Sequence, residues 1–276
     1  MSRPETGGGE AARRRSSSLR RHITVEKLLT LSTVAGVLLV WTIVTGLKLF
    51  PEVLVPSPGR VLSSFLQIAR EGYKDHSLLV HLRDSLLRLS AAFLLVIVTA
   101  VPVGLLSGYS SKIRAVFNPL IEFYRPLPPL AYYTLLVLWM GIEDSSKIAL
   151  LYLAGFAPVY IACESGVRKL KRDYIDGAYT LGAGKWQIFG HVVFPACLPD
   201  IFVGLRTAFG VSYTTLVAAE MVAAVTGIGW MVLDASKFLR SDIIFVGIIM
   251  MGLTGVLIDI LLRALERKVV TWKEKE

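Results

Sequence analysis

The segment Gly182-Ala183-Gly184-Lys185 is the feature of this sequence that most suggests phosphate chemistry. A P-loop requires a glycine five residues before Gly184 and a serine or threonine after the lysine, but Tyr179 and Trp186 occupy these positions. The pair Gly227 and Gly229 lacks the third glycine and the βαβ setting of a dinucleotide site. We therefore expect this chain to bind no nucleotide, so any ATP would be bound by another protein.

Cysteine and histidine also fall outside the patterns of catalytic or metal sites. Cys163 and Cys197 have no CxxC neighbour and no metal-ligand spacing, so we expect two unpaired thiols embedded in apolar surroundings. The four histidines form no HExxH pattern. The sequence thus predicts no catalytic residues, no metal site and no cofactor bound by the chain itself.

Composition and its distribution favour a membrane protein. Of the 276 residues, 54% are hydrophobic and only 18% are charged, below the quarter typical of soluble domains. A helix needs about 20 residues to cross about 30 Å of hydrocarbon. Apolar segments of this kind predict an all-α polytopic membrane protein with about six transmembrane helices. Their ranges are 28–47, 86–108, 119–141, 147–166, 200–225 and 242–265.

Two parts of this pattern are irregular. In the third predicted span, three prolines fall within 126–129, which disrupts helical hydrogen bonding, so we expect the helix proper to resume near Ala131. Between the first two spans, Val61, Phe65 and Ile68 share one face of a helical repeat, which predicts a short interfacial helix within 51–85.

The positive charges lie mostly on one side of this predicted topology. They gather in the N-terminal segment, at 112–114, at 168–185 and in the C-terminal tail, and the net charge is +9. The positive-inside rule then places both termini in the cytoplasm of a multi-pass protein of a bacterial inner membrane. Because this asymmetry accounts for the basicity and no nucleic-acid motif is present, we expect lipid and no nucleic acid as partner.

The polar segment 174–195 therefore lies at the cytoplasmic face. We expect a short helix from Tyr174 to Ala183 with Asp176 in its early turns, where a carboxylate favours the helix N-terminus. Gly182 allows a tight turn and close approach to another protein. Pro195 and Pro199 are expected to interrupt the return of the chain to the fifth span.

This segment resembles the EAA loop of ABC importer permeases, whose pattern is Glu-Ala-Ala, three residues, Gly, nine residues, Ile, any residue, Leu-Pro. The spacing is intact, with Asp for Glu, Gly for the first Ala, Val for Ile and Phe for Leu. The matching residues are Asp176, Gly177, Ala178, Gly182, Val192, Phe194 and Pro195. Further segments from about residue 28 onward are similar to the taurine, aliphatic sulfonate and nitrate permeases. These are 55–58, 124–131, 156–159, 215–220 and 227–230.

The resemblance implies a type I ABC importer permease fold and transport by alternating access. It implies a second copy of the chain, two cytoplasmic ATPase subunits that bind ATP and Mg, and a solute-binding protein outside the membrane. Taurine is the expected solute, with another aliphatic sulfonate or nitrate as the alternative. A stand-alone channel or a membrane-embedded enzyme is the alternative from another class.

The expected organisation has five parts. Residues 1–25 form a basic, disordered cytoplasmic tail, 26–50 hold the first transmembrane helix, and 51–85 are periplasmic. Residues 86–266 form the permease core with the coupling loop 171–196, and 267–276 form a cytoplasmic tail.

Several polar residues are candidates for the solute pathway. Glu220 either marks a route through the membrane or lies at the outer interface beyond the end of its helix. Arg125 either attracts a sulfonate through charge-assisted hydrogen bonds or, as we favour, pairs with Glu122. The remaining candidates, which could line a polar route between helices, are Tyr132, Tyr133, Thr214 and Thr215.

Overall fold

The computed structural model describes residues 28–272 of the chain, so the predictions for 1–25 and 273–276 lie outside the described residues. The chain divides into two units, Met1–Ser63 and Ser64–Glu276. The first unit contains a helix over Leu28–Gly46, which confirms the first predicted span. The amphipathic helix α2 (Pro58–Glu71) crosses the boundary between the units and confirms the helix expected within 51–85.

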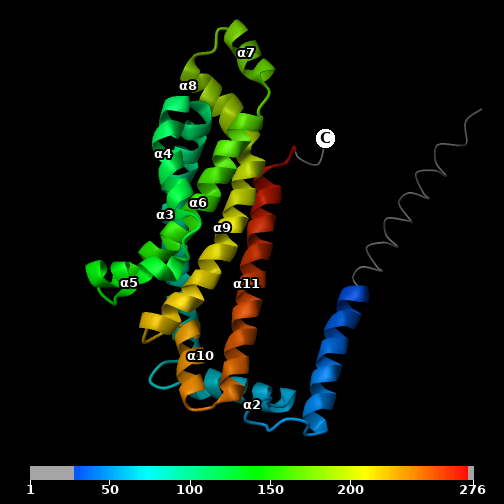
Figure 1. Cartoon of the computed structure of the whole chain (residues 1–276). Coiled ribbons are helices and arrows are strands. Elements are labelled where there is room, and N and C mark those ends of the chain that lie inside the picture. The colour runs from blue at the N-terminus through cyan, green and yellow to red at the C-terminus, as the bar shows by residue number, and fades with distance from the viewer. Residues whose placement is uncertain (1–27, 273–276) are drawn as a thin grey trace, which may run out of the picture. The chain divides into compact units, whose positions relative to one another are not determined.

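Three long helices form the centre of the second unit. Helix α6 (Asp144–Lys169) packs against both α3 (Leu78–Tyr109) and α9 (Phe194–Ala223), as Figure 1 shows. The close approach of α3 to α6 depends on glycine, because a Cβ on Gly104 or Gly108 would come within 2.8 Å of a backbone oxygen of α6. These two glycines form a GxxxG pattern, which is typical of closely packed helices.

Helix α11 (Ser241–Val269) packs on α9, and the ten-residue helix α10 (Ile228–Lys237) connects the two. Many large apolar side chains of α11 are exposed, among them Leu253, Leu257 and Leu261. Within the described residues, five helices are long and apolar enough to cross a membrane. They are Leu28–Gly46, α3, α6, the segment Lys185–Ala223 and α11.

The third predicted span is interrupted at its prolines, as expected, but its predicted start at residue 119 is wrong. It consists of α4 (Ser111–Tyr124) and the short α5 (Pro129–Met140), separated at 125–128. Pro126 and Pro128 cannot donate backbone hydrogen bonds, so the helix ends before them. With 12 residues, α5 is about 18 Å long, which is short for a membrane about 30 Å thick.

The predicted interruption before the fifth span is also wrong. A π-helical turn, η1 (Phe189–Val193), leads directly into α9, with Pro195 in its first turn and Pro199 inside it. Proline has no backbone N–H to donate to the carbonyl four residues earlier. For Pro195 that carbonyl belongs to His191, which lies in the π turn, where backbone bonds span five residues and not four. The helical path from Lys185 to Ala223 is therefore continuous.

Candidate functional site

A compact helix-turn-helix lies at one end of the second unit (Figure 1) and contains the EAA-like residues from Asp176 to Gly182. It consists of α7 (Arg172–Thr180), a turn at 181–184, and α8 (Lys185–Ile188), which continues into η1. Val192 lies in the following η1, and Phe194 and Pro195 begin α9. Helix α7 begins two residues earlier than predicted, so Asp173 occupies its first turn and Asp176 lies in the next one. Both carboxylates remain in the N-terminal half, where the helix dipole favours them.

The turn is closed by a Schellman motif around Gly182. The Gly182 amide donates to the carbonyl of Tyr179 at 2.9 Å, and the Ala183 amide donates to Ala178 at 3.0 Å. Gly182 has a φ of +82°, a left-handed conformation that glycine adopts at little cost. The Gly184 amide then donates to the Gln187 side chain at 2.8 Å, which caps α8. The expected tight turn at Gly182 is confirmed.

One side of this helix-turn-helix packs on the bundle and the other is exposed. Ile175, Ala178 and Val192 pack against the main core of α3, α6 and α9. Leu181 and Trp186, in contrast, are 89% and 81% exposed. Both side chains are therefore accessible for contact with another protein.

A hydrogen bond and one ring contact connect this segment to α3. The Tyr109 hydroxyl, at the end of α3, lies 3.4 Å from the Tyr179 hydroxyl of α7. The Tyr109 ring also meets the Phe189 ring edge-on at 5.9 Å, and Phe189 contacts Trp186 in turn. A displacement of α7 and α8 would therefore act on α3 as well as on α9.

The second candidate site is a buried polar network at the opposite end of α9. Arg88 of α3 donates 2.9 Å hydrogen bonds to Glu220 Oε1 and to the carbonyl of Thr226. It also donates to Asp144 at 2.7 Å. Ser85 donates to Glu220 at 2.7 Å. Helix α3 begins eight residues before the predicted start of this span, which places Arg88 and Ser85 within its helical turns.

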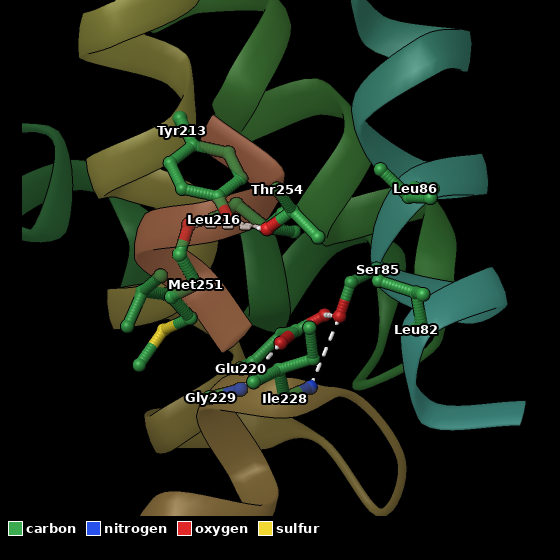
Figure 2. Close-up of a pocket in the computed structure, with 11 residues that line it drawn as sticks. Leu82, Ser85, Leu86, Tyr213, Leu216, Glu220, Ile228, Gly229, Met251 and Thr254 are labelled. Atoms are coloured by element: carbon green, nitrogen blue, oxygen red, sulfur yellow. Dashed lines mark hydrogen bonds between the residues drawn. The ribbon is translucent and has the colours of Figure 1, made fainter. Parts of the chain in front are cut away.

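The carboxylate of Glu220 also caps the N-terminus of α10. The Gly229 amide donates to Glu220 Oε2 at 2.9 Å, and the Ile228 amide donates to Ser85 at 3.0 Å, as Figure 2 shows. Gly227 precedes α10 with a φ of +124°, and a Cβ there would lie 2.4 Å from the Glu220 carboxyl group. The glycines of 227–229 thus let the backbone close on the carboxylate.

This network leaves little space. The cavity beside it, bordered by Ser85, Tyr213, Glu220 and Thr254 (Figure 2), has a volume of about 10 Å³. A single water needs at least this much room, so the cavity holds no solute in this arrangement of the chain. Glu220, three residues before the end of α9 and 1% exposed, is buried within the protein and does not lie at an interface beyond its helix.

The other pathway candidates are scattered. On α5, Tyr133 is buried and Tyr132 is half-buried. On α9, Thr215 is buried and Thr214 is exposed, and both hydroxyls donate to backbone carbonyls of their own helix. Arg125 is exposed at the end of α4, and the described ion pairs do not join it to Glu122. The structure brings none of them to Glu220 except Tyr133, whose hydroxyl donates to the Ala219 carbonyl at 3.5 Å.

Arg88 was not identified from the sequence as a candidate. The available signal was an arginine inside a predicted apolar span, which requires a buried partner. The partner lies 132 positions later in the chain, so only the fold could identify it.

Comparison with known protein families identifies the family of this chain. Residues 100–271 match the model of the binding-protein-dependent transport system inner membrane component. The chain belongs to this permease family. The match covers more than half of the chain, including α7, α8 and both ends of α9.

Individual relatives agree with this assignment. The chain is 41% identical to the taurine transport system permease protein TauC of Escherichia coli K12 over 92% of this chain and 91% of that protein. It is 32% identical to the putative aliphatic sulfonates transport permease protein SsuC of Bacillus subtilis over 87% and 85% of the two chains. It is 29% identical to the nitrate import permease protein NrtB of Synechocystis over 80% and 82%.

A solved structure shows the same fold. The inward-facing MetNI methionine ABC transporter superposes with a TM-score of 0.59 at 14% sequence identity, over 70% of this chain and 95% of that one. The chain is thus an all-α permease of the ABC importer type, with its apolar helices in the membrane.

Proposed function

We propose that this permease is the membrane subunit of an ATP-driven importer that carries taurine into the cell. The observation that supports the substrate is the 41% identity to the Escherichia coli taurine permease over nearly the full length of both chains. Another aliphatic sulfonate or nitrate is the alternative, since permeases named for those solutes are 32% and 29% identical.

The proposed working unit contains two copies of this chain, two cytoplasmic ATPase subunits that bind ATP and Mg, and an external solute-binding protein. The exposed Leu181 and Trp186 would contact the ATPase, and the helix-turn-helix would transmit its motion. The continuous helical path from Lys185 to Ala223 supports this role. A continuous helix transmits a movement at one end to the other, whereas a flexible loop would absorb it. Both termini would then be cytoplasmic, on the side of α7 and α8.

The transport step would follow alternating access. Closure of the ATPase pair would draw the two helix-turn-helix segments together and open the bundle to the outside. Nucleotide hydrolysis would return the bundle to the inward-facing form. This chain would provide the conduit and the mechanical connection, and it would catalyse no bond chemistry.

Growth on a single sulfur source tests the substrate. A strain in which this gene is deleted is grown on taurine, on another alkanesulfonate or on sulfate, with and without a plasmid copy. We expect the deletion strain to lose growth on taurine but not on the other two sulfur sources, and to recover growth on taurine with the plasmid. Unchanged growth on taurine, with loss on another sulfonate, would assign the chain to that solute instead.

A further inference from the structure

A cavity of about 450 Å³ lies between the ends of α3 and α6 and the starts of α4 and α7. Its polar lining includes Tyr109, Ser111 and three arginines, Arg114, Arg168 and Arg172. The volume is sufficient for a small solute or a lipid headgroup. The cavity is separate from the network around Glu220, which lies at the other end of the bundle.

Two helix N-termini open at this cavity. Helix α4 begins at Ser111 and α7 at Arg172, and neither has a side-chain hydrogen bond from its N-cap residue, Ser110 or Lys171. The first amides of a helix have no partner within the helix, and its dipole is positive at this end. Both termini therefore offer N–H donors and partial positive charge to a bound anion.

The arginines add full positive charge that the chain itself compensates only in part. The Glu164 carboxylate lies 3.3 Å from Arg168 and 3.7 Å from Arg114. Arg172 has no carboxylate partner in the part of the chain that the structure describes. Three guanidinium groups thus share one carboxylate, which leaves the cavity with a net positive charge.

We propose that this cavity binds a tetrahedral oxyanion, such as inorganic phosphate or the phosphate of an anionic phospholipid headgroup. Guanidinium groups match such oxygens with paired hydrogen bonds, and the amides of two helix termini supply additional donors. The proposal stands independently of taurine as the transported solute.

Equilibrium binding of radiolabelled inorganic phosphate to the purified full-length chain in detergent tests the site. We expect saturable binding that the Arg172→Gln variant weakens by about tenfold, because one charged donor is removed. The double variant Arg114→Gln/Arg172→Gln should bind more weakly still. Arg267→Gln, an exposed arginine of α11 outside the cavity, is the matched control and should bind as wild type.

Removal of the competing carboxylate gives a test with the opposite sign. Glu164→Gln should strengthen phosphate binding, since the arginines then have no internal counter-charge. Because Arg172 is exposed, Arg172→Gln should fold as wild type, and this single variant decides the outcome if the double variant proves unstable.

The source of the anion is resolved by repeating the measurement in lipid nanodiscs. Loss of phosphate binding in phosphatidylglycerol, but not in phosphatidylcholine, assigns the site to an anionic headgroup. Retained binding in both assigns it to a soluble anion, and either result supports the site. Binding that is not saturable, or that Arg172→Gln and Arg267→Gln alter equally, overturns the proposal.

Discussion

Arg88 and Glu220 form an ion pair of 2.9 Å, with side chains only 5% and 1% exposed. The pair connects α3 to the end of α9 and, through the amide of Gly229, to the start of α10. Two buried charges are costly unless each is fully bonded, and here each one has several partners. The network therefore determines where α10 sits on the bundle.

Loss of one partner of this pair should destabilise the protein strongly. Arg88→Met leaves the Glu220 carboxylate buried without its cation, which costs about 3–5 kcal/mol in comparable pairs. We expect thermal unfolding in detergent to shift to lower temperature accordingly. The double variant Arg88→Met/Glu220→Leu should recover part of this loss, because no unpaired charge remains. Equal unfolding temperatures for Arg88→Met and wild type would contradict a structural role for the pair.

The turn before α10 should tolerate no side chain at residue 227. Gly227→Ala forces a Cβ to within 2.4 Å of the Glu220 carboxyl group and a left-handed φ on a non-glycine residue. We expect a loss of at least about 1–3 kcal/mol in unfolding free energy. Gly210→Ala is the control, since a Cβ at that helical position meets no atom within 4 Å. That variant should be neutral or slightly more stable, by up to about 1 kcal/mol. Similar destabilisation by both substitutions would refute the argument from geometry.

A bulky residue at Gly182 should disrupt communication between the permease and the ATPase, so that transport and ATPase activity both fall. Gly182→Val cannot adopt the φ of +82° without strain, so the Schellman turn between α7 and α8 would open. We expect both solute uptake and transport-dependent ATPase activity of the assembled complex to fall by at least about tenfold, which is about 1.4 kcal/mol of coupling. Gly252→Ala is the control: it lies inside α11, outside the helix-turn-helix, with open space around it, and should leave both activities unchanged. Wild-type uptake by an intact Gly182→Val complex would exclude the coupling role of this turn.

The exposed apolar tip of the helix-turn-helix should matter for assembly and not for folding. Because Leu181 is 89% exposed, Leu181→Asp removes no internal packing and should leave the unfolding temperature of the isolated chain unchanged. It places a charge in the proposed ATPase contact, and we expect much less ATPase to co-purify with the tagged permease. Leu239→Asp, at a residue 70% exposed in the turn between α10 and α11, serves as the comparison. If both variants retain the ATPase equally, the contact lies elsewhere.

The sequence determined the features that depend on local chemistry. Runs of apolar residues long enough to cross a membrane predicted helices near their observed positions, because every backbone group in lipid must bond within its own segment. The spacing of Asp176, Gly182 and Pro195 located the helix-turn-helix, since a left-handed glycine and the helix-terminus preferences act within a few residues.

The tertiary structure decided what depends on distant partners. The helix continues through Pro195 because a π turn accommodates the proline, and the sequence pattern does not resolve this. The pairing of Arg88 with Glu220, and the meeting of Arg114 with Arg172 at one cavity, require helices far apart in the chain to pack side by side. Charge and hydrogen bonding act over a few ångströms in space, so only the fold shows which buried charges are neutralised.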